Sequence, residues 1–296
     1  MLDDVKAKTA QITRSFTFKG ITIAVLVLLL LIPGAMIQAL ISERQQRSRE
    51  TIREINQKWS SSQTLCAPLL LIPYTTARVD KDNKPYNTEH TLYVTPKELQ
   101  IDASLTPEER YYGIYKAILY KSDIRFKGNF SELARLRVES SELHFDKARI
   151  AIGITDLKGV TRIPDFKIDG ETLETNVGTM NLNLSGGTLI VSLQDINLKD
   201  SLHQSLNFEC AMQLNGSASL SFIPVGQNTS VTVDGQWQSP SFIGGFSPES
   251  TIDNTRFNAV WNILSFNREI PVAWSDNNVS SRLADISFGV NLDRDG

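Results

Sequence analysis

The chain has 296 residues and a formal net charge of −3, with 30 Lys and Arg against 33 Asp and Glu. Charges of both signs are interspersed and no basic block stands out beyond the flanks of one apolar segment, which argues against a nucleic-acid-binding protein. The sequence contains no Walker loop, dinucleotide fingerprint or Gly-x-Ser-x-Gly motif, so the common phosphate-binding and nucleophilic chemistries have no support.

The first predicted element is an uncharged apolar segment at residues 20–41. As a helix rising about 1.5 Å per residue it would cross roughly 30 Å of hydrocarbon, and in lipid only a helix satisfies the backbone of a lone segment. The run is longer than that of a signal peptide and no Ala-x-Ala pair ends it, so we expect an uncleaved anchor. Pro33 and Gly34 predict a kink; with Ala35 and Ala39 they could instead mark a packing face.

Basic residues flank both ends of this segment and do not decide its orientation. They are Lys6, Lys8, Arg14 and Lys19 before it, and Arg44, Arg47, Arg49, Arg53 and Lys58 after it. Long domains cross membranes largely regardless of charge, and several Glu residues dilute the basic character of the distal flank. We therefore expect residues 1–19 inside the cell and the chain after about residue 42 outside.

Residues 42–64 are expected to form a membrane-proximal helix that continues the anchor without a break. Residues 42–60 are charged nearly all round, and Ile52, Ile55 and Trp59 form their apolar stripe. This pattern is typical of a solvated helical stalk. Trp59 is expected to be buried against the domain that follows.

From Leu65 onward the apolar period changes from 3.6 to 2, which is typical of β-strands. The expected strands are 150–155, 188–193, 206–214, 217–223, 229–237, 257–263 and 286–292. The expected turns are Asp169-Gly170, Gly186-Gly187, Asn215-Gly216 and Asp234-Gly235. The fold class predicted is therefore mainly β: one transmembrane helix, a short helical stalk and a large antiparallel β domain over residues 65–296.

One part of this domain fits two structures. Residues 106–109 resemble a capping box with Pro107 at the first helical position, although residues 114–126 also fit a strand. We expect a short helical turn followed by a long strand. A short helix is expected at residues 131–136, because Leu133 and Leu136 would share one face.

The sequence identifies no catalytic, cofactor-binding or metal-binding residue. His90, His144 and His203 are isolated from one another, and no Cys-x-x-Cys is present. Cys66 and Cys210 could form one disulfide in an oxidising compartment or could both be small buried core residues. Carboxylates such as Glu108, Glu109 and Asp123 are expected to be solvated surface charges.

Several ordered blocks resemble the CreD family of cell-envelope integrity inner-membrane proteins. The blocks are LLLLIP at 28–33, ISER at 41–44, APLLLIPY at 67–74, Arg110, GIY at 113–115, Tyr120, GNF at 128–130, ITDLKG at 154–159, LNGS at 214–217, FIPVGQNT at 222–229, Trp237, SPSFIGGF at 239–246 and FNAVW at 257–261. Trp237, Phe242, Phe246 and Trp261 also fit core anchors. Family members continue into a bundle of further membrane helices, so the resemblance implies that this sequence is a truncated form or a fragment.

The resemblance implies a protein of the bacterial cytoplasmic membrane with a periplasmic domain, linked to envelope integrity and to a carbon-source-responsive two-component regulon. It carries over no catalytic residue and no cofactor. The expected function is therefore a non-enzymatic envelope protein whose partners are the lipid bilayer and an unidentified envelope protein, without nucleic acid or metal. The alternatives are a membrane-fusion-type transport adaptor, which needs a long helical hairpin, and an envelope hydrolase with converging titratable groups.

Overall fold

A computed structural model describes residues 16–138, 141–179, 186–196, 198, 205–275 and 277–293. The chain divides into two compact units, Met1–Ile52 and Arg53–Gly296. His203, expected to be isolated, lies outside the described residues.

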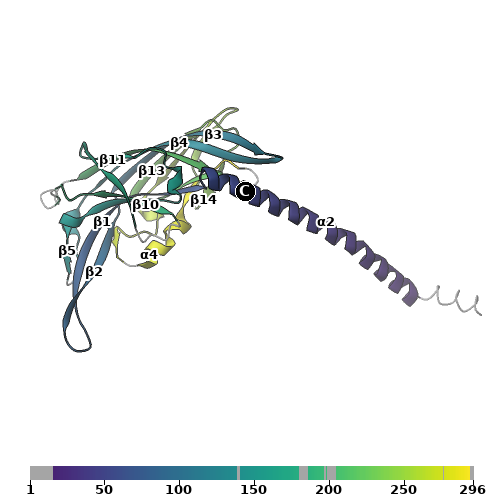
Figure 1. Cartoon of the computed structure of the whole chain (residues 1–296), viewed down its shortest axis with the longest axis horizontal. Helices are drawn as coiled ribbons and strands as arrows, with labels where there is room; N and C mark the ends of the chain where they lie inside the picture. Colours follow the sequence, from purple (N-terminus) through teal and green to yellow (C-terminus); the bar gives the residue numbers. More distant parts are fainter. Residues whose placement is uncertain are drawn as a thin grey trace, which may run out of the picture. The chain divides into compact units, whose positions relative to one another are not determined.

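The long helix α2 (Phe16–Trp59) contains the predicted anchor and continues through the predicted stalk without a break (Figure 1). Within the described part of the chain, Lys19–Thr51 is the one helical segment long and apolar enough to cross a membrane. Its large apolar side chains are exposed all round, as at Leu30 (72%), which suits a helix surrounded by lipid. Pro33 lies inside the helix and does not end it. The helix ends at Trp59, which is half-buried, so the membrane-proximal helix is shorter than the expected range 42–64.

The first sheet has ten strands in the order β14-β18-β12-β1-β6-β10-β9, while β2 and β5 pair with β1, and β17 pairs with β2. Its strands are β1 (Gln63–Val79), β2 (Pro85–Val94), β5 (Ser141–Leu143), β6 (Arg149–Ile154), β9 (Thr175–Gly178), β10 (Gly187–Ser192), β12 (Ser219–Ile223), β14 (Ser241–Gly244), β17 (Ala273–Trp274) and β18 (Phe288–Asn291). The central part of β1 is buried on both faces, so this sheet runs through the interior of the domain.

The second sheet has eight strands in the order β15-β16-β13-β3-β4-β11-β7-β8. Its strands are β3 (Glu98–Tyr112), β4 (Tyr115–Phe130), β7 (Asp165–Ile168), β8 (Glu171–Leu173), β11 (Leu206–Ser217), β13 (Asn228–Gly235), β15 (Glu249–Ile252) and β16 (Phe257–Ile263). Buried residues alternate with exposed or half-buried ones along β13 and β16, and along β11 as far as Gly216. This sheet therefore has one face on the core and one in solvent, as the period-2 pattern predicts.

Short helical segments connect the strands. They are the 3₁₀ turns η1 (Leu133–Arg135), η2 (Phe145–Lys147), η3 (Leu157–Gly159), η4 (Ser265–Asn267) and η5 (Leu283–Ile286), and the helix α4 (Asn277–Arg282). The short helix expected at residues 131–136 is thus the 3₁₀ turn η1, with Leu133 buried and Leu136 half-buried.

The two sheets share one hydrophobic core. An aromatic cluster joins them: Trp261 of β16 lies 5.4 Å from Phe288 of β18 and 5.7 Å from Phe242 of β14, measured between ring centroids. The indole nitrogen of Trp261 donates a hydrogen bond to the carbonyl oxygen of Phe246 at 3.0 Å. The chain itself passes from β11 of one sheet into β12 of the other at Ala218, whose φ is 56°. Trp261 is therefore a core anchor, as expected from its size.

The structure corrects three local predictions. Residues 106–109 belong to β3 and form no helical turn, because β3 pairs with β4 from Glu98 to Tyr112. Asn215-Gly216 lies inside β11, and Asp234-Gly235 ends β13 without forming a hairpin turn. Each sheet is otherwise antiparallel, as predicted, and contains one parallel pair, β1 with β12 in the first sheet and β3 with β13 in the second. In contrast, Asp169-Gly170 forms the predicted turn between β7 and β8, with positive φ at both residues.

Candidate binding cleft

The candidate site lies where β1 changes its neighbour within the first sheet. On one side β1 pairs with β6 as far as Leu71, opposite Arg149, and then pairs with β5 from Tyr74, opposite Leu143. Pro73 stands between these two pairings, and its ring removes the N–H that a continuous ladder would use. Its carbonyl oxygen accepts a hydrogen bond from the backbone N–H of His144 at 2.8 Å.

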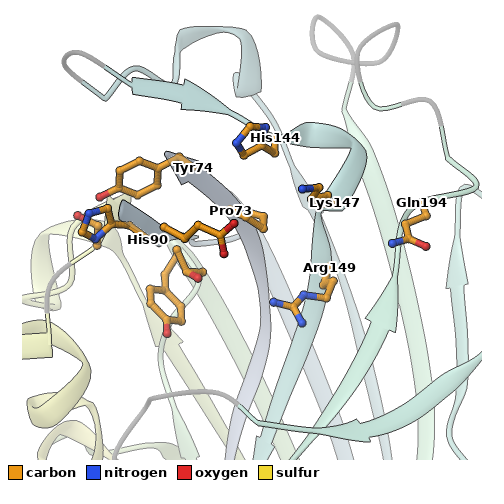
Figure 2. A pocket seen from close by; sticks show the side chains of 11 residues that line it. Pro73, Tyr74, His90, His144, Lys147, Arg149 and Gln194 are labelled. Atoms are coloured by element: carbon orange, nitrogen blue, oxygen red, sulfur yellow. The ribbon is translucent and has the colours of Figure 1, made fainter. Parts of the chain in front are cut away.

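The connection between β5 and β6 places three polar side chains beside this gap. It includes His144 and the turn η2, whose last residue is Lys147, and it ends at Arg149, the first residue of β6. Ala148, between the two cations in sequence, is fully buried. Because the backbone is extended there, Lys147 and Arg149 both point away from Ala148 into solvent, on the same face. In Figure 2, Arg149 points its guanidinium group toward the space beside Pro73, and Lys147 lies next to it.

The opposite wall comes from β2 and β17. Glu89, Thr91 and Tyr93 alternate along β2, and the ring of Tyr93 stacks on Trp274 with centroids 5.5 Å apart. Gln194, which follows β10, and Ser275, which follows β17, complete the lining. Together these residues line an open cleft with a volume of about 790 Å³.

The two histidines that the structure describes, His90 and His144, both line this cleft. Each forms a hydrogen bond with a threonine of β1. Nε2 of His144 lies 3.0 Å from Oγ1 of Thr75, and Nε2 of His90 lies 3.1 Å from Oγ1 of Thr76. The ring of His90 also stacks on Tyr74 at 5.1 Å, and Figure 2 shows these two side chains together at one end of the cleft. These contacts fix the orientation of both imidazoles.

The cleft has an excess of positive charge. Neither Lys147 nor Arg149 forms an ion pair or a side-chain hydrogen bond with any residue that the structure describes, and Glu89 is the one acid in the lining. Two free cations beside neutral donors such as Gln194 provide the groups that bind phosphate or carboxylate. The arrangement can therefore hold an anionic ligand.

Sequence reasoning did not find this site. His90 and His144 are far apart in the chain, and both reach this cleft because β1 pairs with both β2 and β5. A local signal existed at residues 147–150, where Lys, Ala, Arg and Ile alternate and predict two cations on one side of a strand.

The two cysteines and the singled-out carboxylates lie away from the cleft. Cys66 in β1 and Cys210 in β11 are buried free thiols and form no disulfide. Burial raises the pKa of each thiol to about 12, which makes both unreactive near neutral pH. Glu108 and Glu109 form surface ion pairs, and Asp123 accepts a hydrogen bond from Gln213 at 2.9 Å.

Comparison with known proteins assigns most of the chain to one family. The family described as inner membrane protein CreD matches residues 15–295. Inner membrane protein CreD of Escherichia coli strain K12 is 29% identical over 262 residues, which cover 87% of this chain and 55% of that relative. The chain thus spans about half the length of the curated relative that it matches.

Proposed function

The chain belongs to the CreD family of inner membrane proteins, and from this premise we propose that it contributes to envelope integrity as a non-enzymatic binding protein. The helix α2 anchors it in the inner membrane, and the β domain works in the periplasm. The cleft beside Pro73 binds an anionic envelope glycan through phosphate or carboxylate groups. The observation that carries this proposal is the pair of free cations, Lys147 and Arg149, at a cleft of about 790 Å³.

A hydrolase is the second candidate, because the hydroxyl of Thr75 lies 3.0 Å from Nε2 of His144. A nucleophile beside a base is the first requirement of covalent hydrolysis, but the base also needs a third group that orients it. The described residues place no carboxylate in hydrogen-bond contact with His144. Binding without cleavage therefore fits the site better.

The transport-adaptor alternative required a long helical hairpin with sustained heptads. The described residues contain one long helix, α2, and the short helix α4, so this part of the chain provides no second arm for a hairpin. The described residues therefore give the transport-adaptor hypothesis no support.

The proposal is tested by measuring how the full-length chain in lipid nanodiscs binds two purified glycans, lipopolysaccharide and peptidoglycan sacculi. We expect binding to at least one of them, weakened by salt. The double variant Lys147→Gln/Arg149→Gln should bind at least about tenfold more weakly, because each hydrogen bond to a charged group contributes about 1.5–3 kcal/mol.

A matched control removes the same charge elsewhere on the domain. In Lys167→Gln/Arg256→Gln the lost cations are ones already paired, with Asp165 at 3.4 Å and Asp234 at 3.7 Å. This control should bind the glycan as the unmodified chain does. Equal losses in the two double variants, or no glycan binding at all, would contradict the proposal. Cleavage of bound glycan that stops in Thr75→Val would favour the hydrolase.

A further inference from the structure

The tip of the β3–β4 hairpin differs from the other long hairpin of the domain. β1 and β2 are joined by the charged residues Asp80, Lys81, Asp82 and Lys84 with Asn83 among them. β3 and β4 are joined through the uncharged sequence Tyr-Tyr-Gly-Ile-Tyr at residues 111–115. A loop tip in solvent is normally polar, so an aromatic and aliphatic tip needs an explanation.

The backbone of the tip presents the side chains of Tyr111 and Ile114 to solvent. Tyr112 pairs with Tyr115 across a two-residue turn, and Gly113 has a φ of 61°, as the first central residue of a type II′ turn requires. Ile114 at the second central position is 83% exposed, and Tyr111 is 66% exposed. The pairing of β13 with β3 stops at Leu105, so the closed end of the hairpin extends past that neighbour.

The charged residues just behind the tip neutralise one another. Arg110 pairs with Glu108 at 2.9 Å, and Lys116 pairs with Glu109 at 2.5 Å. Tyr111 donates its hydroxyl hydrogen to Glu109 at 2.8 Å. The hydrogen bonds from Lys116 and Tyr111 hold the pKa of Glu109 below its ordinary value, so this pair remains ionised near neutral pH.

We propose that the tip of the β3–β4 hairpin, residues 111–115, inserts into the interfacial layer of the membrane that anchors the chain. Tyrosine suits this layer because its ring is apolar and its hydroxyl is polar, and Ile114 supplies an aliphatic group to the acyl region. The tether raises the concentration of the tip near the bilayer, so few inserted residues suffice. Because the flanking charges cancel, insertion depends on apolar burial and not on anionic lipid.

A fluorescence experiment on the full-length chain tests this contact. Ile114→Cys is labelled with the environment-sensitive dye NBD, and the chain is reconstituted in vesicles of phosphatidylethanolamine and phosphatidylglycerol. Cys66 and Cys210 are buried, so a folded protein takes up one dye, and uptake of more reports unfolding. We expect emission at shorter wavelength and quenching by lipids that carry a nitroxide near the top of the acyl chain.

The matched control is Asp82→Cys at the tip of the β1–β2 hairpin, where the dye should stay in water and resist lipid quenching. High salt should leave the signal at residue 114 unchanged. Adding Tyr111→Ser should reduce the quenching. A shift to shorter wavelength without lipid quenching would mean that the tip contacts protein, such as a second copy, and would overturn the proposal. The absence of any shift, or its loss in high salt, would do the same.

Discussion

At the scale of single residues, the buried amide of Gln63 joins three segments of the β domain. Three acceptors lie within hydrogen-bond distance of its Nε2 and share its two hydrogens: Oγ of Ser60 at 2.7 Å and the carbonyl oxygens of Asp156 and Asn215 at 2.9 and 3.2 Å. Its Oε1 accepts from the backbone N–H of Asp156 at 3.1 Å. Gln63 is fully buried, so water cannot replace these bonds.

We predict that Gln63→Leu destabilises the chain by about 3 kcal/mol, because each buried polar group left without a partner costs about 1–3 kcal/mol. Denaturant unfolding of the full chain in detergent micelles, followed by tryptophan fluorescence, measures this loss. The control Gln213→Leu makes the same change on the exposed face of β11 and should stay within about 0.5 kcal/mol. Similar losses in the two variants would mean that the Gln63 network contributes nothing specific.

At the scale of elements, β4 is central to the second sheet, because β3 pairs with one of its edges and β11 with the other. Gly128 of β4 lies opposite Leu99 on one side and Phe208 on the other. A Cβ atom at this position would overlap the carbonyl oxygen of Glu98 and approach the Phe208 ring to 2.6 Å. The close approach of these strands therefore requires glycine.

Gly128→Ala is expected to lower the free energy of unfolding by about 1–3 kcal/mol, the usual cost of forcing an extra methyl group into a packed site. The same denaturant measurement applies. Gly245→Ala is the matched control, since no atom lies within 4 Å of the added Cβ there. If Gly128→Ala were as stable as Gly245→Ala, the strands would be able to separate at no cost.

Elements with strict alternation were predictable from local sequence. The range expected at 257–263 is the strand β16, because its buried residues Phe257, Ala259, Trp261 and Ile263 follow the period of two. The segment at Pro107 was predicted wrongly because its local cap signal competes with long-range pairing. β13 pairs with β3 only up to Leu105, so Pro107 lies on an edge where its missing N–H is tolerated.

The cleft could not be predicted in the same way, because it depends on contacts between distant parts of the chain. His90 faces it from β2 and His144 from the connection after β5, and only their common neighbour β1 relates them. Periodicity reports which face of a strand is buried but not which strands are neighbours. The chemistry of Lys147 and Arg149 was visible locally, whereas the wall opposite them was not.

At the scale of the whole molecule, the orientation in the membrane decides which partners the β domain can meet. A protein of the inner membrane can place this domain in either compartment, and basic residues on both flanks of the apolar segment leave the charge rule undecided. The length of the domain favours the periplasm, because long domains translocate largely regardless of flanking charge. The orientation can be tested by labelling introduced cysteines, because neither Cys66 nor Cys210 offers a reactive thiolate.

We predict that Ser265→Cys, at an exposed position after β16, reacts with a membrane-impermeant maleimide in intact spheroplasts. Ser15→Cys, placed before the apolar segment, should react only after lysis. Gel-shift detection of the attached label measures both, and the unmodified chain should stay unlabelled because its thiols are buried. The reverse result, with residue 15 labelled in spheroplasts and residue 265 protected, would put the cleft in the cytoplasm. Envelope glycans could not then reach Lys147 and Arg149, and the proposed binding function would fail with the orientation.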